Sequence, residues 1–466
     1  MITIIRKEIL DHVQSLQFLL LLLLCLLLFL GNGLIFGRRY DRQAAWYSRS
    51  VSATRAKPST VSTVLYPEPP RVAFISEAGD NQAASSYMLG QMGLLRPLPS
   101  GPRNFRLPLV PDPDWSFIIK IIFSLYAILI GYDAVAGEKE AGTLRQMLTG
   151  TVGRTRVLMA KYAAVLITLT IPLLCGVLVS LLTVSVFIPG TLSSPVLSAA
   201  ALTIILGMIY ISLFAFLSML VSSLVHDSSI VLLSILVIWI LFTIIVPNAA
   251  GILSEQITGI PSEFAVAKEL GPAIQKQVWD KINVIGEMAE KGEITSEEEL
   301  RRRTDEAFGE GQKSLKTFYD AYDKSVRGRA AVSRALSRFS PTALFQYAVE
   351  DICWTGISRE ERFLREAIAY AEVFDRYAIA KTGKLVAASG WGFGTFIEVQ
   401  GKQVFIGSPR PEEYRGDKSD FPWFVERPRP IGEGLQNALP DSAGLLLWNI
   451  VLACGAIGAM MRSDVR

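Results

Sequence analysis

Residues that could carry out catalysis are few in this chain and scattered along it. The two histidines, His12 and His226, are far apart, and the four cysteines form no C-x-x-C pair, so zinc, redox and histidine-based nucleophilic sites have little support. The sequence lacks G-x-x-x-x-G-K-[ST], H-E-x-x-H and G-x-S-x-G. Residues 311–314 and 416–419 match G-x-K-S, but neither segment has the glycine loop whose backbone amides hold the phosphates. We therefore predict no catalytic residue, no metal site and no cofactor in this chain.

A short charged stretch instead has the composition of a docking helix. Residues 138–147 combine good helix formers with charges and lie between two apolar runs. Such a helix at a membrane boundary can dock on a soluble ATPase and transmit its motion as a rigid lever. Early acidic residues favour the helix dipole, and Gly142 permits close approach of a partner. The alternative is a solvated connector whose charges only anchor its neighbours.

The elements that position this stretch are membrane spans. The chain of 466 residues is 50% hydrophobic and 19% charged, with a mean hydropathy of +0.36, which is too apolar for a soluble protein of this size. Crossing the hydrocarbon takes about 20 largely apolar residues. Six segments qualify, namely residues 16–36, 115–132, 161–187, 197–224, 229–247 and 443–461. Residues 2–14 have an apolar helical face and read either as an interfacial helix or as a flank of the first span.

The distribution of charge predicts the orientation. The short loop after the second span is rich in lysine and arginine, and both ends of the chain are basic, so the positive-inside rule places both termini and this loop in the cytoplasm. Arg38, Arg39 and Arg42, just past the first span, disagree with this orientation. The net charge of +3 and the lack of a basic run give no support to nucleic acid as a partner.

Two long segments, 37–114 and 248–442, then face outward. Apolar periodicity predicts a helical, hairpin-like projection over 261–380 with a turn at Gly328, and residues 384–408 are β-rich. Residues 71–75 predict a strand in the first segment, and we expect the two β-rich parts to fold together. The predicted fold class is an α-helical polytopic membrane protein of six transmembrane helices plus an α+β extracytoplasmic domain that contains a helical hairpin. The predicted divisions are 1–36, 37–114, 115–247 with a coupling loop at 133–161, 248–442 and 443–466.

The charged stretch also resembles the signature of ABC-2-type permeases, E-x-E-x-G-T-L after the second span, followed by an arginine and a lysine that lead into the third. The positions that match are Asp133, Glu138, Glu140, Gly142, Thr143, Leu144, Arg154 and Lys161. Ser222-Ser223-Leu224, Trp239 with Pro247, and Ser340-Pro341 are similar to further family features. The large segment before the last span is similar to that of gliding-motility and nitrous-oxide-reductase-maturation permeases.

The resemblance implies the membrane subunit of an ABC transporter, and an exporter rather than an importer. The matching residues would couple it to separate ABC ATPase subunits, which would hold the ATP and magnesium. Other implied partners are a second permease, identical or homologous, and the lipid of the bacterial inner membrane.

Three further residues are candidates for a substrate pathway. Lys120 lies within the second span, where an ionisable group is a functional candidate, although its long side chain can also reach water at the outer edge. Tyr126 and Tyr210 could line a path, or they could be ordinary packing aromatics. Two alternative functions are a membrane-anchored extracytoplasmic sensor or binding protein without an ATPase partner, and a polytopic membrane enzyme.

Overall fold

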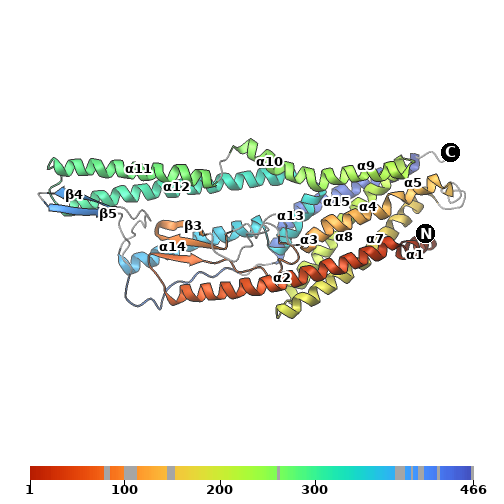
Figure 1. Cartoon of the computed structure of the whole chain (residues 1–466), viewed down its shortest axis with the longest axis horizontal. Coiled ribbons are helices and arrows are strands. Elements are labelled where there is room, and N and C mark those ends of the chain that lie inside the picture. The colour runs from red at the N-terminus through yellow and green to blue at the C-terminus, as the bar shows by residue number, and fades with distance from the viewer. Residues whose placement is uncertain are drawn as a thin grey trace.

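The computed structural model describes residues 1–77, 84–98, 113–143, 153–259, 263–383, 394–399, 402–407, 414–427 and 431–462. The molecule is elongated, with both termini at one end, called here the proximal end, and an extramembrane domain at the other, the distal end (Figure 1). The α-helices are α1 (Ile2–Val13), α2 (Leu16–Ala56), α3 (Trp115–Phe117), α4 (Ser124–Gly131), α5 (Asp133–Glu140), α7 (Arg154–Phe187), α8 (Ser194–Leu224), α9 (Ser228–Ile240), α10 (Val246–Thr258), α11 (Glu263–Glu290), α12 (Glu297–Ser337), α13 (Pro341–Cys353), α14 (Ile357–Thr382) and α15 (Ile431–Arg462). The strands are β1 (Ser62–Leu65), β2 (Ser86–Gly90), β3 (Leu94–Leu98), β4 (Gly394–Val399) and β5 (Lys402–Gly407).

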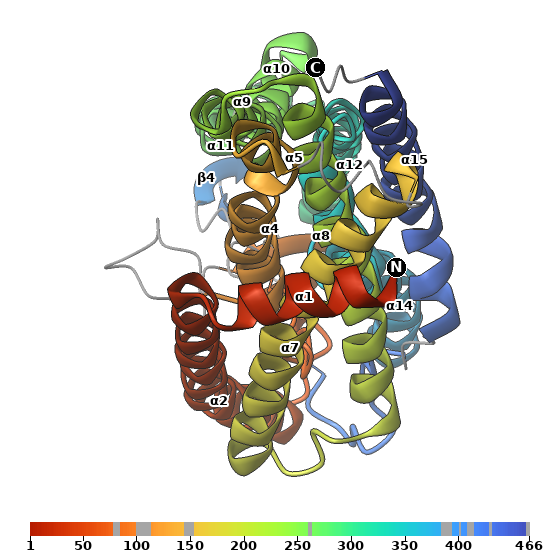
Figure 2. The same ribbon diagram turned by 90° about the vertical axis from the view of Figure 1, so that its right-hand side faces the viewer.

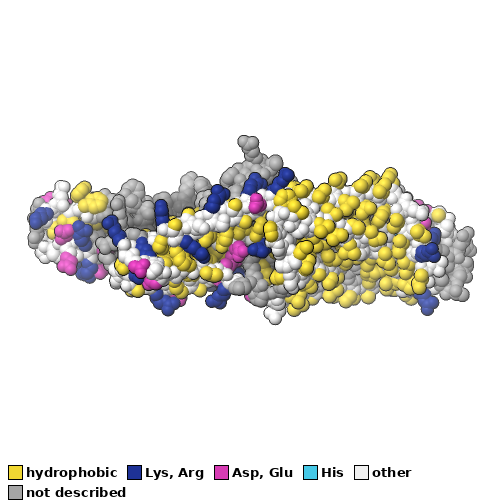
Figure 3. Space-filling model, turned by 90° about the horizontal axis from the view of Figure 1, so that it is seen from below, with side chains coloured by type: hydrophobic (Ala, Val, Ile, Leu, Met, Phe, Trp, Pro, Cys, Tyr) yellow, Lys and Arg dark blue, Asp and Glu magenta, His cyan; other side chains and the backbone are white. Residues whose placement is uncertain are grey.

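Six helical segments within the described residues are long and apolar enough to cross a membrane, as predicted. They form one bundle, and on the face seen in Figure 3 hydrophobic side chains cover most of the proximal half of the molecule. Two spans contain a π-helical turn, Ile118–Phe123 between α3 and α4, and Leu241–Ile245 between α9 and α10. The freed carbonyls are satisfied from other helices, since Tyr210 donates to the carbonyl of Lys120 and Ser340 to that of Phe242.

Several spans are longer than the sequence predicted. The last, α15, begins at Ile431 rather than at residue 443, and the third, α7, begins at Arg154 rather than at residue 161. The helix α2 continues beyond residue 36 to Ala56, so that it enters the extramembrane domain. There Arg39 pairs with Glu77 at 2.6 Å, which explains why basic residues follow the first span against the charge rule. The fifth span continues through Pro247, which lies two residues after the π-helical turn Leu241–Ile245, as far as Thr258.

The extramembrane domain contains two separate sheets. Strands β1, β2 and β3 form an antiparallel sheet, with Val64 opposite Met88 and Leu89 opposite Leu95. This sheet packs on α14 through an aromatic-rich core that includes Tyr87, Phe363 and Phe374. Strands β4 and β5 pair only with each other among the described strands, so the expectation that the two β-rich parts fold together is wrong. Part of the predicted β-rich segment, residues 384–393, lies outside the described residues.

The predicted strand at residues 71–75 is also wrong. The segment is a turn in which the N–H of Ile75 donates to the carbonyl of Val72. Phe74 and Ile75 are buried in the core of the membrane bundle, and the carbonyl of Phe74 accepts from Asn32 and from the N–H of Trp115. Burial against helices therefore accounts for this apolar run, which we predicted as a strand from the sequence.

The helices α11 and α12 form an antiparallel hairpin, called here the arm, which reaches to the distal end with β4 and β5 at its tip (Figure 1). At 41 residues, α12 is about 60 Å long. Apolar residues of β4 and β5, such as Ile397 and Ile406, pack with Ile282 and Phe308 of the arm. The predicted turn at Gly328 is wrong, because α12 runs through it alongside α10, with Arg329 paired to Glu255 at 3.0 Å.

Candidate coupling site

A buried lysine joins three helices at the proximal end. Lys161 lies two turns into α7 and is only 4% exposed. Its ammonium nitrogen lies 2.6 Å from a carboxylate oxygen of Glu138 in α5 and 3.1 Å from one of Glu8 in α1. A buried charge needs such partners to offset the loss of its hydration. The structure thus brings together two predicted residues, Glu138 and Lys161, and adds Glu8.

The helix α1 lies across the proximal end of the bundle, over α7 (Figure 2). Besides the Glu8 contact, the ring nitrogen Nδ1 of His12 lies 3.5 Å from Thr168 of α7. Burial lowers the pKa of His12 below its ordinary value, and the nearby Glu8 carboxylate partly opposes this shift. The predicted helix over residues 2–14 is confirmed as α1 (Ile2–Val13), and its polar face contributes to the site.

The residue after Glu138 fastens α5 to the end of α8. Lys139 donates to the carbonyl of Ser223 at 2.6 Å and to that of Ser222 at 3.4 Å. These carbonyls belong to the last turn of α8, where acceptors lack an intrahelical donor and a cation is favourable. The hydroxyl of Ser222 in turn accepts from the N–H groups of Val135 and Ala136, at 3.1 and 2.8 Å.

Glu140 makes the matching contact with the next helix. Its carboxylate accepts from the N–H of Ser228 at 2.7 Å. This N–H lies in the first turn of α9, where backbone donors have no acceptor within the helix. The carboxylate of Asp227 caps the same turn through Ser229 and Ile230. The consecutive residues Glu138, Lys139 and Glu140 therefore hold α5 against α7, α8 and α9, while Lys161 links α1 to the same site through Glu8. This interlock is the central feature of the site.

The remaining predicted coupling residues lie around this interlock. Asp133, in the first turn of α5, interacts electrostatically with Lys161 and His12. Gly142 ends the helix with a φ of +70°, a conformation that favours glycine, and the hydroxyl of Thr143 donates to the carbonyl of Glu138 at 3.4 Å. Leu144 lies outside the described residues.

Arg154, at the start of α7, forms a separate contact. Its guanidinium donates to the carbonyl of Met461, at the end of α15, at 3.0 Å. The coupling region is therefore connected to the last span as well as to α1, α7, α8 and α9.

The candidate pathway residues occupy the bundle interior. Tyr210 is fully buried, donates to the carbonyl of Lys120 at 3.2 Å and lies 2.9 Å from the hydroxyl of Thr342. Lys120 interacts electrostatically with Asp114 and Glu350, so its charge has protein partners that sequence reasoning missed. Tyr126 is half-buried against the core. A pathway role for Lys120, Tyr126 and Tyr210 stays a prediction.

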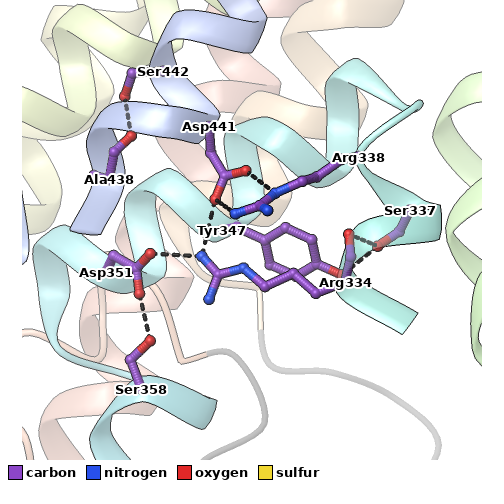
Figure 4. A network of polar contacts seen from close by, with 9 residues as sticks. All are labelled: Arg334, Ser337, Arg338, Tyr347, Asp351, Ser358, Ala438, Asp441 and Ser442. Carbon is purple, nitrogen blue, oxygen red and sulfur yellow. Dashed lines mark hydrogen bonds and ion pairs between the residues drawn. The ribbon is translucent and has the colours of Figure 1, made fainter. Parts of the chain in front are cut away.

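A second ionic cluster lies at the distal end of the bundle, where the arm meets the last span (Figure 4). Arg334 lies in the final turn of α12, and Arg338 follows directly after the helix. Both bind Asp441 of α15, Arg334 at 2.9 Å and Arg338 at 2.6 Å. Arg334 also binds Asp351 of α13 at 2.6 Å, and Ser358 donates to the same aspartate. Both carboxylates are buried, at 0% and 2% exposed. We call this cluster the arm joint.

Nothing in the sequence marked the arm joint or Glu8. Their ion-paired residues are separated by 17 to 153 positions in the chain, and only the fold brings them together. The serine pair before the fifth span was noted as a family feature, and the structure supplies its physical reason in the contacts of Ser222 with α5.

Two comparisons with known proteins agree with this geometry. The family model described as "ABC-2 family transporter protein" matches residues 2–391 of the chain. A stretch of 69 residues is 33% identical to the "Probable ABC transporter permease protein NosY" of Stutzerimonas stutzeri, covering 15% of this chain and 25% of that relative. The chain therefore belongs to the ABC-2 transporter family and is a membrane permease subunit of an ABC transporter.

Proposed function

We propose that this permease couples ATP hydrolysis on separate nucleotide-binding subunits to export through, or mechanical work across, the bacterial inner membrane. The observation that carries the proposal is the interlock of Glu138, Lys139 and Glu140 with α7, α8 and α9, to which Lys161 joins α1 through Glu8. A partner that displaced α5 would move α7, α8 and α9 together, because each is tied to one of three consecutive residues of this short helix. The helix α1 would follow through the contact of Glu8 with Lys161. This is the property required of a lever that transmits the motion of an ATPase.

The proximal end is the side on which we place the ATPase. The helix α5, the start of α7, both described ends of the chain and α1 all lie there (Figure 1). The excess of lysine and arginine in the short loop after the second span supports a cytoplasmic position for that side. ATP and magnesium would be held by the partner, and the permease would supply the docking helix and the transmembrane path.

The last span offers a route for motion from the coupling region to the arm. The helix α15 is continuous from Ile431 to Arg462. Near its proximal end the carbonyl of Met461 accepts from Arg154, and near its distal end Asp441 binds Arg334 and Arg338 of the arm. A shift of α15 along or about its axis would therefore move the arm. This connection favours mechanical work by the arm as a second candidate output beside passage of a substrate.

The test is co-expression of this chain with a candidate ABC ATPase, co-purification in detergent, and an ATPase assay in lipid. The variant Glu138→Gln removes the charge that pairs with Lys161, and Asp11→Asn is the matched control, since Asp11 is on the same side and its side chain is 60% exposed. We expect permease-stimulated ATPase activity to fall at least about tenfold in Glu138→Gln and to stay unchanged in Asp11→Asn.

If no ABC ATPase binds the intact chain, the coupling proposal is wrong. The rival in which the extramembrane domain acts as a sensor or binding protein would then take its place. Equal activity in both variants would leave the family assignment intact but would remove the coupling role from Glu138.

A further inference from the structure

The first span is followed by two exposed arginines, Arg38 and Arg42, that form no ion pair in the part of the chain that the structure describes. The Nε of Arg42 donates to the carbonyl of Arg38 at 3.3 Å, and its terminal nitrogens have no hydrogen-bond partner among the described residues. Like charges four residues apart on a helix repel each other. A shared anion would therefore stabilise this part of α2.

Both arginines lie on the side of α2 that faces the lipid. Leu20, Leu27 and Leu34 are exposed on the membrane part of this helix, Leu27 at 66%. At about 100° per residue, these three leucines, Arg38 and Arg42 all fall within a sector of about 80° around the helix axis. The stripe that faces the hydrocarbon therefore continues directly into the two arginines.

The height of the arginines matches the headgroup layer at the distal surface of the membrane. The hydrocarbon takes up about 20 residues of helix, which from Leu16 extend to about Ile35. Arg38 and Arg42 follow Ile35 by about 5 and 10 Å, and the headgroups occupy about 5–7 Å on each side. The hydrogen bond from Arg42 to the preceding turn directs its side chain back toward the membrane. Both guanidinium groups therefore lie level with the headgroups.

The second span marks the same height independently. Arg39, next to Arg38, lies 2.6 Å from a carboxylate oxygen of Glu77. The N–H of Glu77 donates to the carboxylate of Asp114 at 2.8 Å. The following residue, Trp115, begins the second span. The distal boundary of the hydrocarbon on this helix is thus level with the first of the two exposed arginines.

We propose that Arg38 and Arg42 bind the phosphate headgroup of an anionic phospholipid in the distal leaflet. A guanidinium keeps its charge and donates parallel hydrogen bonds to phosphate oxygens. Two described carboxylates near this point of the chain do not compete, since Glu77 is paired with Arg39 and Asp41 forms an ion pair with neither arginine. A lipid fits because the stripe is apolar along the hydrocarbon and becomes cationic where the headgroups begin. The site does not depend on the proposed coupling to an ATPase.

Lipid binding of this kind accounts for the arginines that follow the first span against the charge rule. Arg39 pairs with Glu77 on the protein side of the helix, whereas Arg38 and Arg42 face the membrane surface. The helix α2 continues unbroken to Ala56 in the extramembrane domain (Figure 1). A headgroup bound at the two arginines would therefore hold this domain at a fixed height above the membrane.

Quenching of a local fluorophore by brominated lipids tests this contact. Leu34→Cys places a bimane label on the stripe one turn before Arg38, after the exposed Cys175 and Cys454 have been replaced by alanine. The full chain is reconstituted in bilayers that contain brominated phosphatidylglycerol or brominated phosphatidylcholine. We expect phosphatidylglycerol to bind beside the label about fivefold more tightly than phosphatidylcholine. The double variant Arg38→Gln with Arg42→Gln should abolish this preference.

The matched control is Arg49→Gln. Arg49 is exposed on the same face of α2 and donates in the same way to the carbonyl of Ala45, at 3.0 Å. It lies about 21 Å beyond Ile35, outside the headgroup layer, so we expect this variant to keep the preference of the unaltered chain. Raising the salt from about 0.05 to about 0.5 M should weaken that preference, because salt screens exposed charges.

Four results would overturn the inference. These are equal binding of the two lipids to the unaltered chain, a preference that survives in the double variant, an equal loss in Arg49→Gln, and a preference that does not respond to salt. A label shielded from both lipids would also overturn it, because a protein surface would then cover the stripe.

Discussion

Lys161 and Glu138, which are 23 positions apart in the chain, form a buried ion pair of 2.6 Å between α7 and α5. The lysine side chain is 5% exposed and that of Glu138 15%, and Glu8 contributes a second carboxylate, 13% exposed. One cation therefore pairs with two carboxylates from different helices. This arrangement makes Lys161 the residue on which the packing of α1 and α5 against the bundle depends.

Lys161→Met should be strongly destabilising. It leaves two largely buried carboxylates without their counterion, and loss of one partner of a buried pair costs up to about 3–5 kcal/mol. We expect a clear drop in the melting temperature of the purified protein in detergent. The control is Lys7→Met, because the Lys7 side chain is 66% exposed and its ion pair with Asp11 is long, at 3.9 Å. The triple variant Lys161→Met with Glu138→Gln and Glu8→Gln should recover part of the loss, and no recovery would mean that the charges are not the cause.

The arm joint should control the rigidity of the arm. Asp441→Asn removes the charge that binds both Arg334 and Arg338, while Asp417→Asn changes an exposed aspartate of the same domain. We expect a broader distance distribution between spin labels on exposed positions of α12 and α15 in Asp441→Asn, measured by double electron–electron resonance. A distribution as narrow as that of Asp417→Asn would show that packing alone fixes the arm, and the proposed transmission through α15 would lose its support.

The raised pKa of Glu350 predicts that the stability of the protein depends on pH. Burial raises its pKa to about 7, while hydrogen bonding from Gln346 and the nearby charges of Lys120 and Arg334 oppose the shift and Asp351 adds to it. The folded state then binds a proton more tightly than the unfolded state, whose glutamate titrates near 4.3. Stability is therefore greatest below pH 4.3 for this group and falls as the pH rises to about 7, by an amount on the order of 3 kcal/mol.

Glu350→Gln should remove this slope. We expect the variant to be more stable than the unaltered protein at pH 8 and to differ little from it at pH 5, in melting temperatures taken across that range. Glu297→Gln, which changes an exposed residue of the arm whose side chain is 58% exposed, is the control and should follow the unaltered protein. Parallel curves for Glu350→Gln and the unaltered protein would contradict the assigned pKa.

The sequence predicted the membrane part of the fold because lipid imposes a simple rule on it. Long apolar runs identify all six spans, and the spacing of Ile2, Ile5 and Ile9 predicts α1. The ends of the spans were harder to predict, because α2 and α10 continue as helices outside the lipid. There they are no longer marked by an apolar composition. The turn at residues 71–75 was taken for a strand because its apolar side chains are buried by helices that lie far away in the sequence.

For the site, the sequence predicted residues but not their partners. Glu138, Glu140 and Lys161 were selected by resemblance, whereas Glu8, Lys139 and Ser222 enter only through contacts between helices. An ion pair or a helix-end contact depends on the relative positions of the helices, and periodicity carries no information about these positions. The close approach of α2 and α7 was missed for the same reason.

That close approach depends on glycine. A Cβ atom added at Gly33 of α2 would lie 2.8 Å from Cβ of Thr183 in α7 and 3.3 Å from the carbonyl of Ser180, while one added at Gly31, two residues earlier, would meet nothing within 4 Å. Small residues allow membrane helices to pack closely, and overpacking such a contact costs about 1–3 kcal/mol. We expect Gly33→Ala to lower the melting temperature and Gly31→Ala to leave it unchanged or raise it, since alanine favours a helix by about 1 kcal/mol over glycine. Equal effects of the two substitutions would show that α2 and α7 tolerate separation, and that the contact between them does not stabilise the bundle.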